Sequence, residues 1–278
     1  METINSLCAI IVLYKVQLEE SLAFKTLQES LRKIDKKMNL VVYDNAPYSY
    51  QNRDYDEFII KYIPDSNNSG VSRAYNQGCK YAELIGCEYI LLLDQDTALN
   101  DDFIQNSLKC LLPDAHLVAP LLTNGEGTVL SPCAFYLGRG HSLPMEKFKI
   151  GYNKIRYRNF LNSGIIISVS LFNKVGGYNE IIPLYYSDFN FICRAKKYIT
   201  QYYISENICL HDMASADYSN VSIALKRFRY YVIGAYRCYD TLFMKLVMFM
   251  NVLCRALKLF WRTKEIGFIY LVFSRNKQ

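Results

Sequence analysis

Blocks of continuous apolar residues alternate with blocks of helical periodicity along the first hundred residues. The apolar runs, whose lengths fit buried strands, are 7–14, 40–43, 58–63 and 89–93. Between them, apolar positions recur at helical spacing over 18–37 and from Val71 to Ile85, just before Gly86. Strands that alternate with helices in this way form a mostly parallel sheet with right-handed crossovers. The pattern therefore predicts an α/β fold.

The second half of the chain is less regular. Residues 115–160 are richer in glycine, proline and polar residues, which predicts loops and shorter strands. A further apolar strand is expected over 161–168, and a helix over 189–197. A basic helical pattern begins near residue 219. We therefore divide the chain into a main domain, 1–218, with halves 1–100 and 101–218, and an amphipathic helical tail, 219–278.

Composition narrows the class of protein. A hydrophobic fraction of 51% against 21% charged residues is typical of a folded chain and argues against long disorder. Nine cysteines without Cys-x-x-Cys pairs do not indicate a disulfide framework, and three isolated histidines disfavour zinc. The first apolar run follows no basic segment and is too short to span a bilayer, which disfavours a signal peptide. We expect a cytoplasmic, reduced protein.

Charge is unevenly distributed, because the tail holds 11 Lys and Arg residues against two carboxylates. In a helix from Arg237 to Arg262, one side carries the polar residues Arg237, Asn251, Arg255, Lys258 and Arg262. The other side is Leu, Phe, Met, Val and Trp261, a pattern typical of a helix that lies on an anionic membrane. Packing on the main domain and a homodimer contact are the alternatives. The long apolar face disfavours nucleic acid, and no apolar run is long enough to span a bilayer.

Acidic residues stand where two of the predicted strands end. Asp44 follows the second strand and Asp94 the fourth, and ligands bind at the carboxyl ends of strands in open parallel sheets. In Asp94-Gln95-Asp96, two carboxylates one residue apart can reach a divalent cation and the ribose of a nucleotide. A capped turn after a strand explains this triplet equally well when it is considered alone.

The stretch from Asn68 to Gly78 places small and polar residues at the start of a predicted helix, where backbone N–H groups attract anions. We expect Asn68 or Ser69 to cap this helix, and Ala74 and Gly78 to let it approach the sheet. A capped, tightly packed helix explains these residues without a ligand. It explains Asn76 less well, because asparagine is a poor helix former.

In this order, the motifs resemble those of family 2 glycosyltransferases, which have the GT-A fold, and they look most similar to bacterial polysaccharide rhamnosyltransferases. The resemblance covers about residues 6–240. The segments that carry it are Ala9-Ile10-Ile11-Val12-Leu13-Tyr14, Val41-Val42-Tyr43-Asp44-Asn45, Asn68-x-Gly70-x-x-x-Ala74-x-Asn76-x-Gly78, Asp94-Gln95-Asp96, Ser163-Gly164, Gly176-Gly177-Tyr178-Asn179-Glu180, Asp188 and Cys209-Leu210-His211. The resemblance implies a metal-dependent enzyme that moves a sugar from a nucleotide-sugar donor, with its catalytic domain in residues 1–218.

The resemblance also implies roles for single residues. The implied donor-binding residues are Tyr14, Asp44, Asn68, Gly70, Arg73, Asn76, Asp94 and Gln95. The implied ligands of Mg²⁺ or Mn²⁺ are Asp96 and His211, and the implied acceptor side is Ser163, Gly164 and Tyr186. Asp44 is expected to bind the base and Asp94 the ribose. Arg73 reaches the diphosphate in one interpretation and is a solvated helix arginine in the other.

Asp188 is the expected general base of an inverting, in-line displacement, in which it takes the proton of the acceptor hydroxyl. A helix N-cap is an alternative that is compatible with catalysis. For His211 the alternative is a buried, hydrogen-bonded histidine, and His116 and His141 are expected to be structural or on the surface.

The chain departs from the family pattern at three places. Tyr14-Lys15 replaces a frequent Tyr-Asn pair, Tyr185 stands where many relatives carry Asp, and Tyr230-Tyr231 lacks a following Arg-Asn pair. These departures leave the donor and acceptor open. The first expectation for the donor is dTDP-L-rhamnose, and a UDP-hexose such as UDP-glucose or UDP-galactose is the alternative.

The resemblance implies an acceptor on polyprenyl diphosphate, within a cell-surface polysaccharide such as O antigen or capsule, and hence attachment to the inner face of the cell membrane. Two other functions are less well supported. A sugar nucleotidyltransferase would need a Gly-rich loop with Arg and Lys after the first strand, which residues 14–19 lack. A non-catalytic nucleotide-sugar-binding subunit would be favoured by the loss of Asp96 or Asp188, and both are present.

Overall fold

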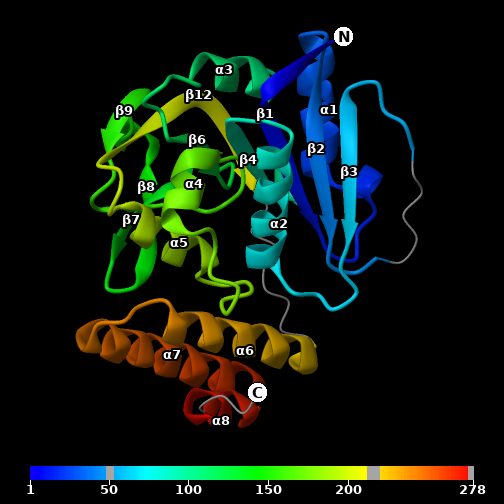
Figure 1. Cartoon of the computed structure of the whole chain (residues 1–278). Helices are drawn as coiled ribbons and strands as arrows, with labels where there is room; N and C mark the ends of the chain where they lie inside the picture. Colours follow the sequence, from blue (N-terminus) through cyan, green and yellow to red (C-terminus); the bar gives the residue numbers. More distant parts are fainter. Residues whose placement is uncertain (48–52, 212–219, 275–278) are drawn as a thin grey trace.

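The computed structural model describes residues 1–47, 53–211 and 220–274. It shows an α/β body with three helices at its C-terminal end (Figure 1). The main path of the sheet runs in the order β10-β7-β6-β11-β4-β1-β2-β3. The predicted α/β class is therefore confirmed. The boundary proposed at residue 219 lies outside the described residues, so the division into domains stays a prediction.

The first half of the sheet is parallel, as the pattern predicted. Its strands are β1 (Glu2–Leu13), β2 (Lys36–Asp44), β3 (Phe58–Pro64) and β4 (Tyr89–Asp94), and β1 lies between β2 and β4. Alternate residues of β1 pack with α1 (Leu22–Lys33) in one core cluster and with α2 (Val71–Leu84) in the other. Because helices cover both faces, the part of β1 that lies between them, residues 7–13, is buried and apolar throughout.

The second half of the sheet is largely antiparallel. Its strands are β5 (Thr97–Ala98), β6 (Leu117–Thr123), β7 (Thr128–Tyr136), β8 (Arg139–Pro144), β9 (Gly151–Lys154), β10 (Arg158–Asn159), β11 (Ile166–Ser168) and β12 (Gln201–His211). Its helices are α3 (Phe103–Lys109), α4 (Val169–Val175) and α5 (Ser187–Ala195). Among these described strands, β12 pairs in parallel with β6 and the other pairs are antiparallel. The pairing of β12 with β5 brings His211 beside Thr97.

Several predicted element boundaries were wrong. The helix expected over 18–37 begins as a short 3-10 helix, Leu18–Glu20, and restarts at Leu22 because the Ser21 side chain accepts a hydrogen bond from the Phe24 N–H. It ends at Lys33, since residues from Lys36 onward pair with β1. The strand expected over 161–168 is confined to Ile166–Ser168.

The cap expected for α2 was also wrong. Gly70, not Asn68 or Ser69, precedes the helix, and no side chain caps it. Gly70 has a φ of 92°, and a Cβ there would lie 2.2 Å from the carbonyl oxygen of Pro183. The Val71 N–H donates to that same oxygen at 2.8 Å. The start of α2 is therefore fixed by a close backbone contact with the segment that leads into α5.

The tail forms three helices rather than the one expected between Arg237 and Arg262. These are α6 (Val221–Arg237), α7 (Leu242–Thr263) and α8 (Gly267–Phe273), and the Thr241 side chain caps α7. Figure 1 shows them as a layer next to α5. Ile182 and Tyr186 of the body belong to the same core cluster as the buried residues of these helices.

The tail and the body approach closely at Gly234 in α6, where a Cβ would lie 2.0 Å from the carbonyl oxygen of Tyr185. The tail thus packs on the segment that carries Asp188. This agrees with packing on the main domain, which was one of the alternatives in the sequence analysis. Within residues 1–47, 53–211 and 220–274, none of the helices combines the length and apolarity needed to cross a membrane.

Candidate active site

The predicted donor-side carboxylates stand on either side of β1. In the strand register, Leu13 of β1 is opposite Asp44 of β2, and Val12 is opposite Asp94 of β4. Neighbouring strands lie about 4.8 Å apart, so the Cα atoms of the two aspartates are separated by roughly 10 Å across the end of β1. This spacing allows one nucleoside to contact Asp44 with its base and Asp94 with its ribose.

Hydrogen bonds fix the orientation of the Asp44 carboxylate. Its Oδ1 accepts from the Ala46 N–H and its Oδ2 from the Tyr62 hydroxyl, each at 2.9 Å. The neighbouring Asn45 accepts from the N–H of Gly70 at 3.1 Å. The predicted donor residues Asn68 and Gly70 therefore lie in a loop that is joined to the end of β2.

Asp65, which the sequence analysis did not select, organises this loop. It accepts hydrogen bonds from the Tyr43 hydroxyl and from the backbone N–H groups of Asn67 and Ser69. Burial alone would raise the pKa of Asp65, but these hydrogen bonds to its ionised form outweigh burial and lower the pKa. Asp65 comes directly after β3, and an aspartate at the end of a strand was the sequence signal that could have identified this residue.

Asp94 is held at the end of β4 by two contacts. Its Oδ1 accepts from the Tyr75 hydroxyl at 2.9 Å, and its backbone N–H donates to the Ser163 hydroxyl at 3.0 Å. Burial and then the charge of Asp96 raise the pKa of Asp94. Ser163 is buried, and the Gly164 N–H donates to Leu92. Ser163 and Gly164, which were predicted on the acceptor side, therefore bind the backbone at the end of β4 that carries Asp94.

Three other predicted donor residues mainly contact the protein itself. The side-chain oxygen of Gln95 accepts from the Tyr14 N–H at 2.8 Å, which holds the loop after β1. Asn76 binds the backbone of Tyr178 through both its amide nitrogen and its amide oxygen. Gln95 and Asn76 thus position segments that border the site, and this explains why an asparagine occurs inside α2.

Arg73 is half-exposed at the start of α2. Its Nη1 lies 4.0 Å from Glu180 Oε2, and both side chains face solvent. A surface pair of this kind contributes little to stability. The guanidinium is therefore available to an anionic ligand at the first turn of α2, and both sequence-based interpretations of Arg73 remain open.

Asp96 and His211 meet although 115 positions separate them in the sequence. His211 Nδ1 lies 3.6 Å from Asp96 Oδ1 and 2.8 Å from the Thr97 hydroxyl. In the part of the chain that the structure describes, no group of three His, Cys, Asp or Glu side chains could hold a metal ion. Mg²⁺ is held by one or two carboxylates together with substrate phosphates and water, and Asp96 is the one carboxylate of this pair.

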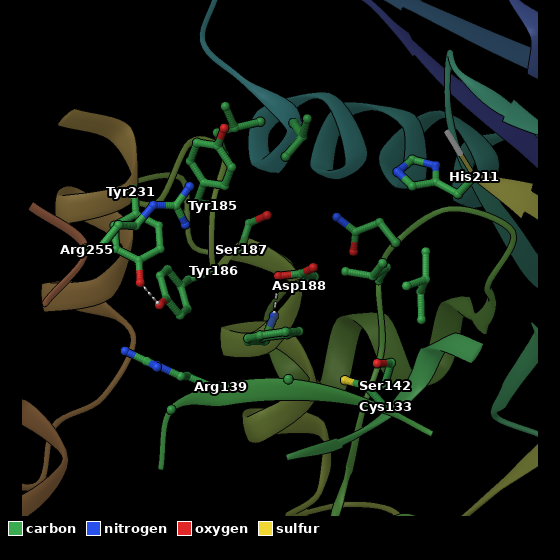
Figure 2. Close-up of a pocket in the computed structure, with 18 of the residues that line it drawn as sticks. Cys133, Arg139, Ser142, Tyr185, Tyr186, Ser187, Asp188, His211, Tyr231 and Arg255 are labelled. Carbon is green, nitrogen blue, oxygen red and sulfur yellow. Dashed lines mark hydrogen bonds between the residues drawn. The ribbon is translucent and has the colours of Figure 1, made fainter. Parts of the chain in front are cut away.

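A cavity of about 840 Å³ lies between the body and the tail, and Figure 2 shows part of its lining. Of the site residues predicted from the sequence, those that line it are Asp94, Tyr186, Asp188 and His211. The cavity therefore connects the end of β4 with the predicted base. The other predicted donor residues do not line it, which places the base-binding side of the site outside this cavity.

Asp188 lies in the first turn of α5 and faces the cavity (Figure 2). Its Oδ1 accepts from the N–H of Phe189 at 2.7 Å, but Tyr186 is the residue that precedes the helix, so Asp188 is not its N-cap. Burial, reinforced by the charge of Asp94, raises the pKa of Asp188 to about 7. A carboxylate with this pKa can accept and release a proton near neutral pH.

Tyr186 holds the start of α5 in place. Its φ of 68° is unusual for a residue other than glycine, and its hydroxyl donates to that of Tyr231 in α6 at 2.9 Å. Such backbone strain persists only where surrounding contacts over-determine it. The position of Asp188, two residues later, therefore depends on contact between the body and the tail.

The sequence analysis missed the role of basic residues in the cavity. The cations in its wall are Arg139, Arg255, Lys258 and Arg262. The sequence analysis placed the last three on the polar side of a helix expected to lie on a membrane, and the structure places them in the wall of the cavity that Asp188 also lines. Arg255 lies over the ring of Tyr231, 4.2 Å from its centroid. The helical spacing of Arg255, Lys258 and Arg262 was visible in the sequence, whereas the cavity they face was not.

Comparison with known proteins identifies the family. Residues 8–160, more than half of the chain, match the profile described as Glycosyl transferase family 2. The chain belongs to this family. The Glycosyl transferase family 2 match contains Asp44, Asp94 and Asp96, and Asp188 and His211 lie beyond it.

One curated relative is the dTDP-rhamnosyl transferase RfbF of Shigella flexneri. It is 24% identical over 199 residues, which make up 70% of this chain and 64% of that protein. The chain thus spans less than two thirds of this relative.

Solved structures of TarS of S. aureus share the fold. For TarS 1–349 the TM-score is 0.51 at 14% identity, over 96% of this chain and 74% of that chain. For TarS 1–349 in complex with UDP-GlcNAc the TM-score is 0.50 at 14% identity, over 93% and 73%.

Proposed function

We propose that this family 2 glycosyltransferase moves a sugar from a nucleotide-sugar donor to a glycan acceptor, with inversion at the anomeric carbon. The observation that carries the proposal is the position of Asp188, whose carboxylate faces a cavity that also reaches Asp94. Our first candidate for the donor is dTDP-L-rhamnose. Support comes from the curated relative, whose name contains dTDP-rhamnosyl transferase.

Different residues act at the two ends of the site, one end binding the nucleoside and the other carrying out the transfer. Asp44 and Asp94 hold the nucleoside, and the sugar extends from the end of β4 into the cavity. The acceptor hydroxyl attacks the anomeric carbon, the bond from that carbon to the phosphate oxygen breaks, and the nucleoside diphosphate leaves. Asp188 takes the proton of the attacking hydroxyl. General base catalysis of this kind makes a reaction about 10²–10⁴-fold faster. The pKa of about 7 suits this proton transfer.

Asp96 and His211 are the residues that would hold Mg²⁺ or Mn²⁺ on the donor diphosphate. Such an ion supplies positive charge to the leaving group. Arg73, at the start of α2, adds a second positive charge on the donor side of the site. The exposed position of Asp96, 49% accessible at its side chain, leaves room for a phosphate next to it.

A UDP-hexose is the second donor candidate. It is supported by the solved TarS complex with UDP-GlcNAc, a neighbour in fold. The two donors differ at the base, where dTDP carries a methyl group, at the pentose, where dTDP lacks the 2′-hydroxyl group, and at the sugar, where rhamnose lacks the 6-hydroxyl group. Asp44 and the loop that carries Asn68 contact the base side, and the cavity near Asp188 contacts the sugar side.

A thermal-shift panel tests the proposed donor. We expect dTDP-rhamnose with Mn²⁺ to raise the melting temperature most, because a ligand at 100 times its Kd stabilises the folded state by about 2.7 kcal/mol. UDP-glucose, UDP-galactose and UDP-GlcNAc are compared at equal concentration, and GDP-mannose serves as a control for an unrelated base. A protein that none of these sugars stabilises, with or without Mn²⁺, contradicts the donor site.

We also propose that the tail attaches the enzyme to an anionic membrane, at the inner face of the cell membrane. The hydrophobic residues that α7, α8 and the turn between them leave exposed are Leu242, Phe243, Leu246, Met250, Leu257, Trp261, Ile266, Tyr270 and Phe273. Lys264 lies 4.9 Å from the ring centroid of Trp261, so basic and aromatic groups stand together at the edge of this surface. Apolar area with adjacent basic charge is the combination that binds anionic lipid surfaces.

The double variant Leu246→Gln/Trp261→Gln tests this attachment. We expect it to lower binding to vesicles of phosphatidylglycerol and phosphatidylcholine by about tenfold or more, because each side chain contributes on the order of 1.5–3 kcal/mol when buried. Leu84→Gln is the matched control, since Leu84 is 81% exposed on α2 and outside the tail. Unchanged co-sedimentation of the double variant with vesicles contradicts the proposal. If the wild type is a dimer and the double variant is a monomer, the surface binds a second copy of the chain instead.

A further inference from the structure

Asn162 is a polar residue of the cavity wall to which the proposed reaction has given no task. It lines the cavity together with Asp94 and Asp188. It also directly precedes Ser163, whose hydroxyl accepts a hydrogen bond from the Asp94 N–H at 3.0 Å. Asn162 therefore stands beside the end of β4, where the sugar enters the cavity in the proposed reaction. Because the residue is 7% exposed, its amide needs hydrogen-bond partners to offset the cost of burial.

The Tyr178 hydroxyl binds one half of the Asn162 amide. It donates to Asn162 Oδ1 at 2.6 Å. Burial, reinforced by the charges of Asp188 and Asp94, raises the pKa of Tyr178 well above its usual value, so the hydroxyl keeps the proton that it donates. Among the residues that the structure describes, Nδ2 of Asn162 hydrogen-bonds to no other group, and it is not one of the fully buried atoms that lack a partner. The N–H groups of this amide are therefore left to the cavity.

Tyr178 is itself held in place from two sides. Asn76 in α2 accepts from the Tyr178 N–H at 2.7 Å and donates to the Tyr178 carbonyl oxygen at 3.0 Å. Arg194 in α5 donates to the carbonyl oxygen of the preceding residue, Gly177, at 2.7 Å. Because these contacts fix the backbone that carries the Tyr178 ring, the orientation of the Asn162 amide is set before any ligand binds.

We propose that Asn162 selects the transferred sugar by donating a hydrogen bond from Nδ2 to one of its hydroxyl groups, and that Tyr178 is the positioning residue that orients the amide. Asp94 holds the ribose and Asp188 faces the acceptor, so the part of the donor that lies between them is the sugar. A sugar without the contacted hydroxyl leaves the amide unpaired, which lowers its affinity. The inference rests on the proposed glycosyl transfer and deepens it by naming a residue that determines sugar specificity.

Calorimetric titration with dTDP-rhamnose and with dTDP, both with Mn²⁺, separates binding of the sugar from binding of the nucleotide. We expect Asn162→Ala to raise the Kd of dTDP-rhamnose by about tenfold and to leave the Kd of dTDP within about twofold, because the variant loses one hydrogen bond to the sugar alone. Asn207→Ala is the matched control. Asn207 is also buried, but its amide donates to the backbone of Phe103 in α3, away from the cavity, so both constants should stay at their wild-type values.

Variants of Tyr178 distinguish recognition of the sugar from support of the fold. Asn162→Ala leaves the Tyr178 hydroxyl buried without its acceptor, so this variant should melt below wild type. Asn162→Ala/Tyr178→Phe removes both partners and should recover most of the melting temperature without recovering the Kd of dTDP-rhamnose. Tyr178→Phe alone frees the amide and should raise this Kd by a smaller factor, about threefold. A double variant that recovers both quantities shows that Asn162 only supports the fold and overturns the proposal.

Donors that each lack one ring hydroxyl group of rhamnose identify the contacted group. For one of them, Asn162→Ala should leave the Kd nearly unchanged, because the hydrogen bond is already missing. An equal loss with every deoxygenated donor overturns the proposal, and so does an unchanged Kd of dTDP-rhamnose in Asn162→Ala. A wild type that binds dTDP but not dTDP-rhamnose overturns it together with the first donor candidate. A wild type that binds neither ligand contradicts the proposed donor site itself, so the two proposals fail in different ways.

Discussion

Asp188→Asn is expected to lower kcat by about 10²–10⁴-fold, because it removes the group that takes the proton from the acceptor hydroxyl. The amide oxygen of asparagine can still accept the hydrogen bond that the Phe189 N–H now donates. Nucleotide binding should therefore stay within a few-fold of wild type. The measurement is steady-state turnover beside a titration of the nucleoside diphosphate, and an exposed carboxylate, Asp114→Asn, is the control.

The same substitution has a defined effect on pH dependence and stability. The base works when ionised, so the wild-type rate should rise with pH through about 7, the pKa of Asp188, and the residual rate of the variant should lack this step. Because the folded-state pKa of about 7 lies above the usual aspartate value of 3.8, the folded state loses stability as pH rises from that usual value to about 7, and the full loss is present at higher pH. At pH 8, Asp188→Asn should therefore melt no lower than wild type. A variant that keeps turnover within a few-fold of wild type would contradict the assignment.

Asp96→Asn is expected to have the second largest effect, a loss of turnover on the order of 10²–10³-fold, because it removes the protein carboxylate next to the donor diphosphate. Two protein ligands, Asp96 and His211, would hold an ion only weakly without the donor diphosphate. We therefore expect Mn²⁺ alone to shift the melting temperature little, and Mn²⁺ with dTDP to shift it clearly. In the variant, this extra shift should disappear.

Asp102→Asn is the matched control for Asp96, since its side chain is 46% exposed against 49% for Asp96 and it lies six residues later. Treatment with EDTA should reduce wild-type turnover and leave the Asp96 variant nearly unchanged. An Asp96 variant whose turnover and metal response match those of wild type would show that this carboxylate does not hold the ion.

The fold of the first half could be predicted because its signals are local. The part of a strand that helices cover on both faces is apolar, and β1, β2 and β4 were found from their apolar runs. Element ends were harder to predict, because they depend on contacts distant in sequence. Gly70 precedes α2 because of Pro183, and neither Asn68 nor Ser69 caps the helix.

In the candidate site, too, local features could be predicted from the sequence and contacts between distant residues could not. Asp44 and Asp94 were predicted from strand ends, and their positions across β1 follow from parallel pairing. The supporting contacts of Asp94 from Tyr75 and Ser163 lie 19 and 69 positions away in the chain, beyond the reach of periodicity. Asp65 was missed because a single aspartate after a strand is also the ordinary sign of a turn.

The sequence by itself determined the α/β class, the strand-end carboxylates and the amphipathic character of the tail, because periodicity and residue type report burial directly. The tertiary structure alone decided which face of the tail meets which partner. One helix expected from Arg237 to Arg262 became the end of α6 and the whole of α7, and the basic row turned to the cavity with Asp188. Periodicity shows that residues share a face, but only packing against the body, as at Gly234, decides what that face contacts.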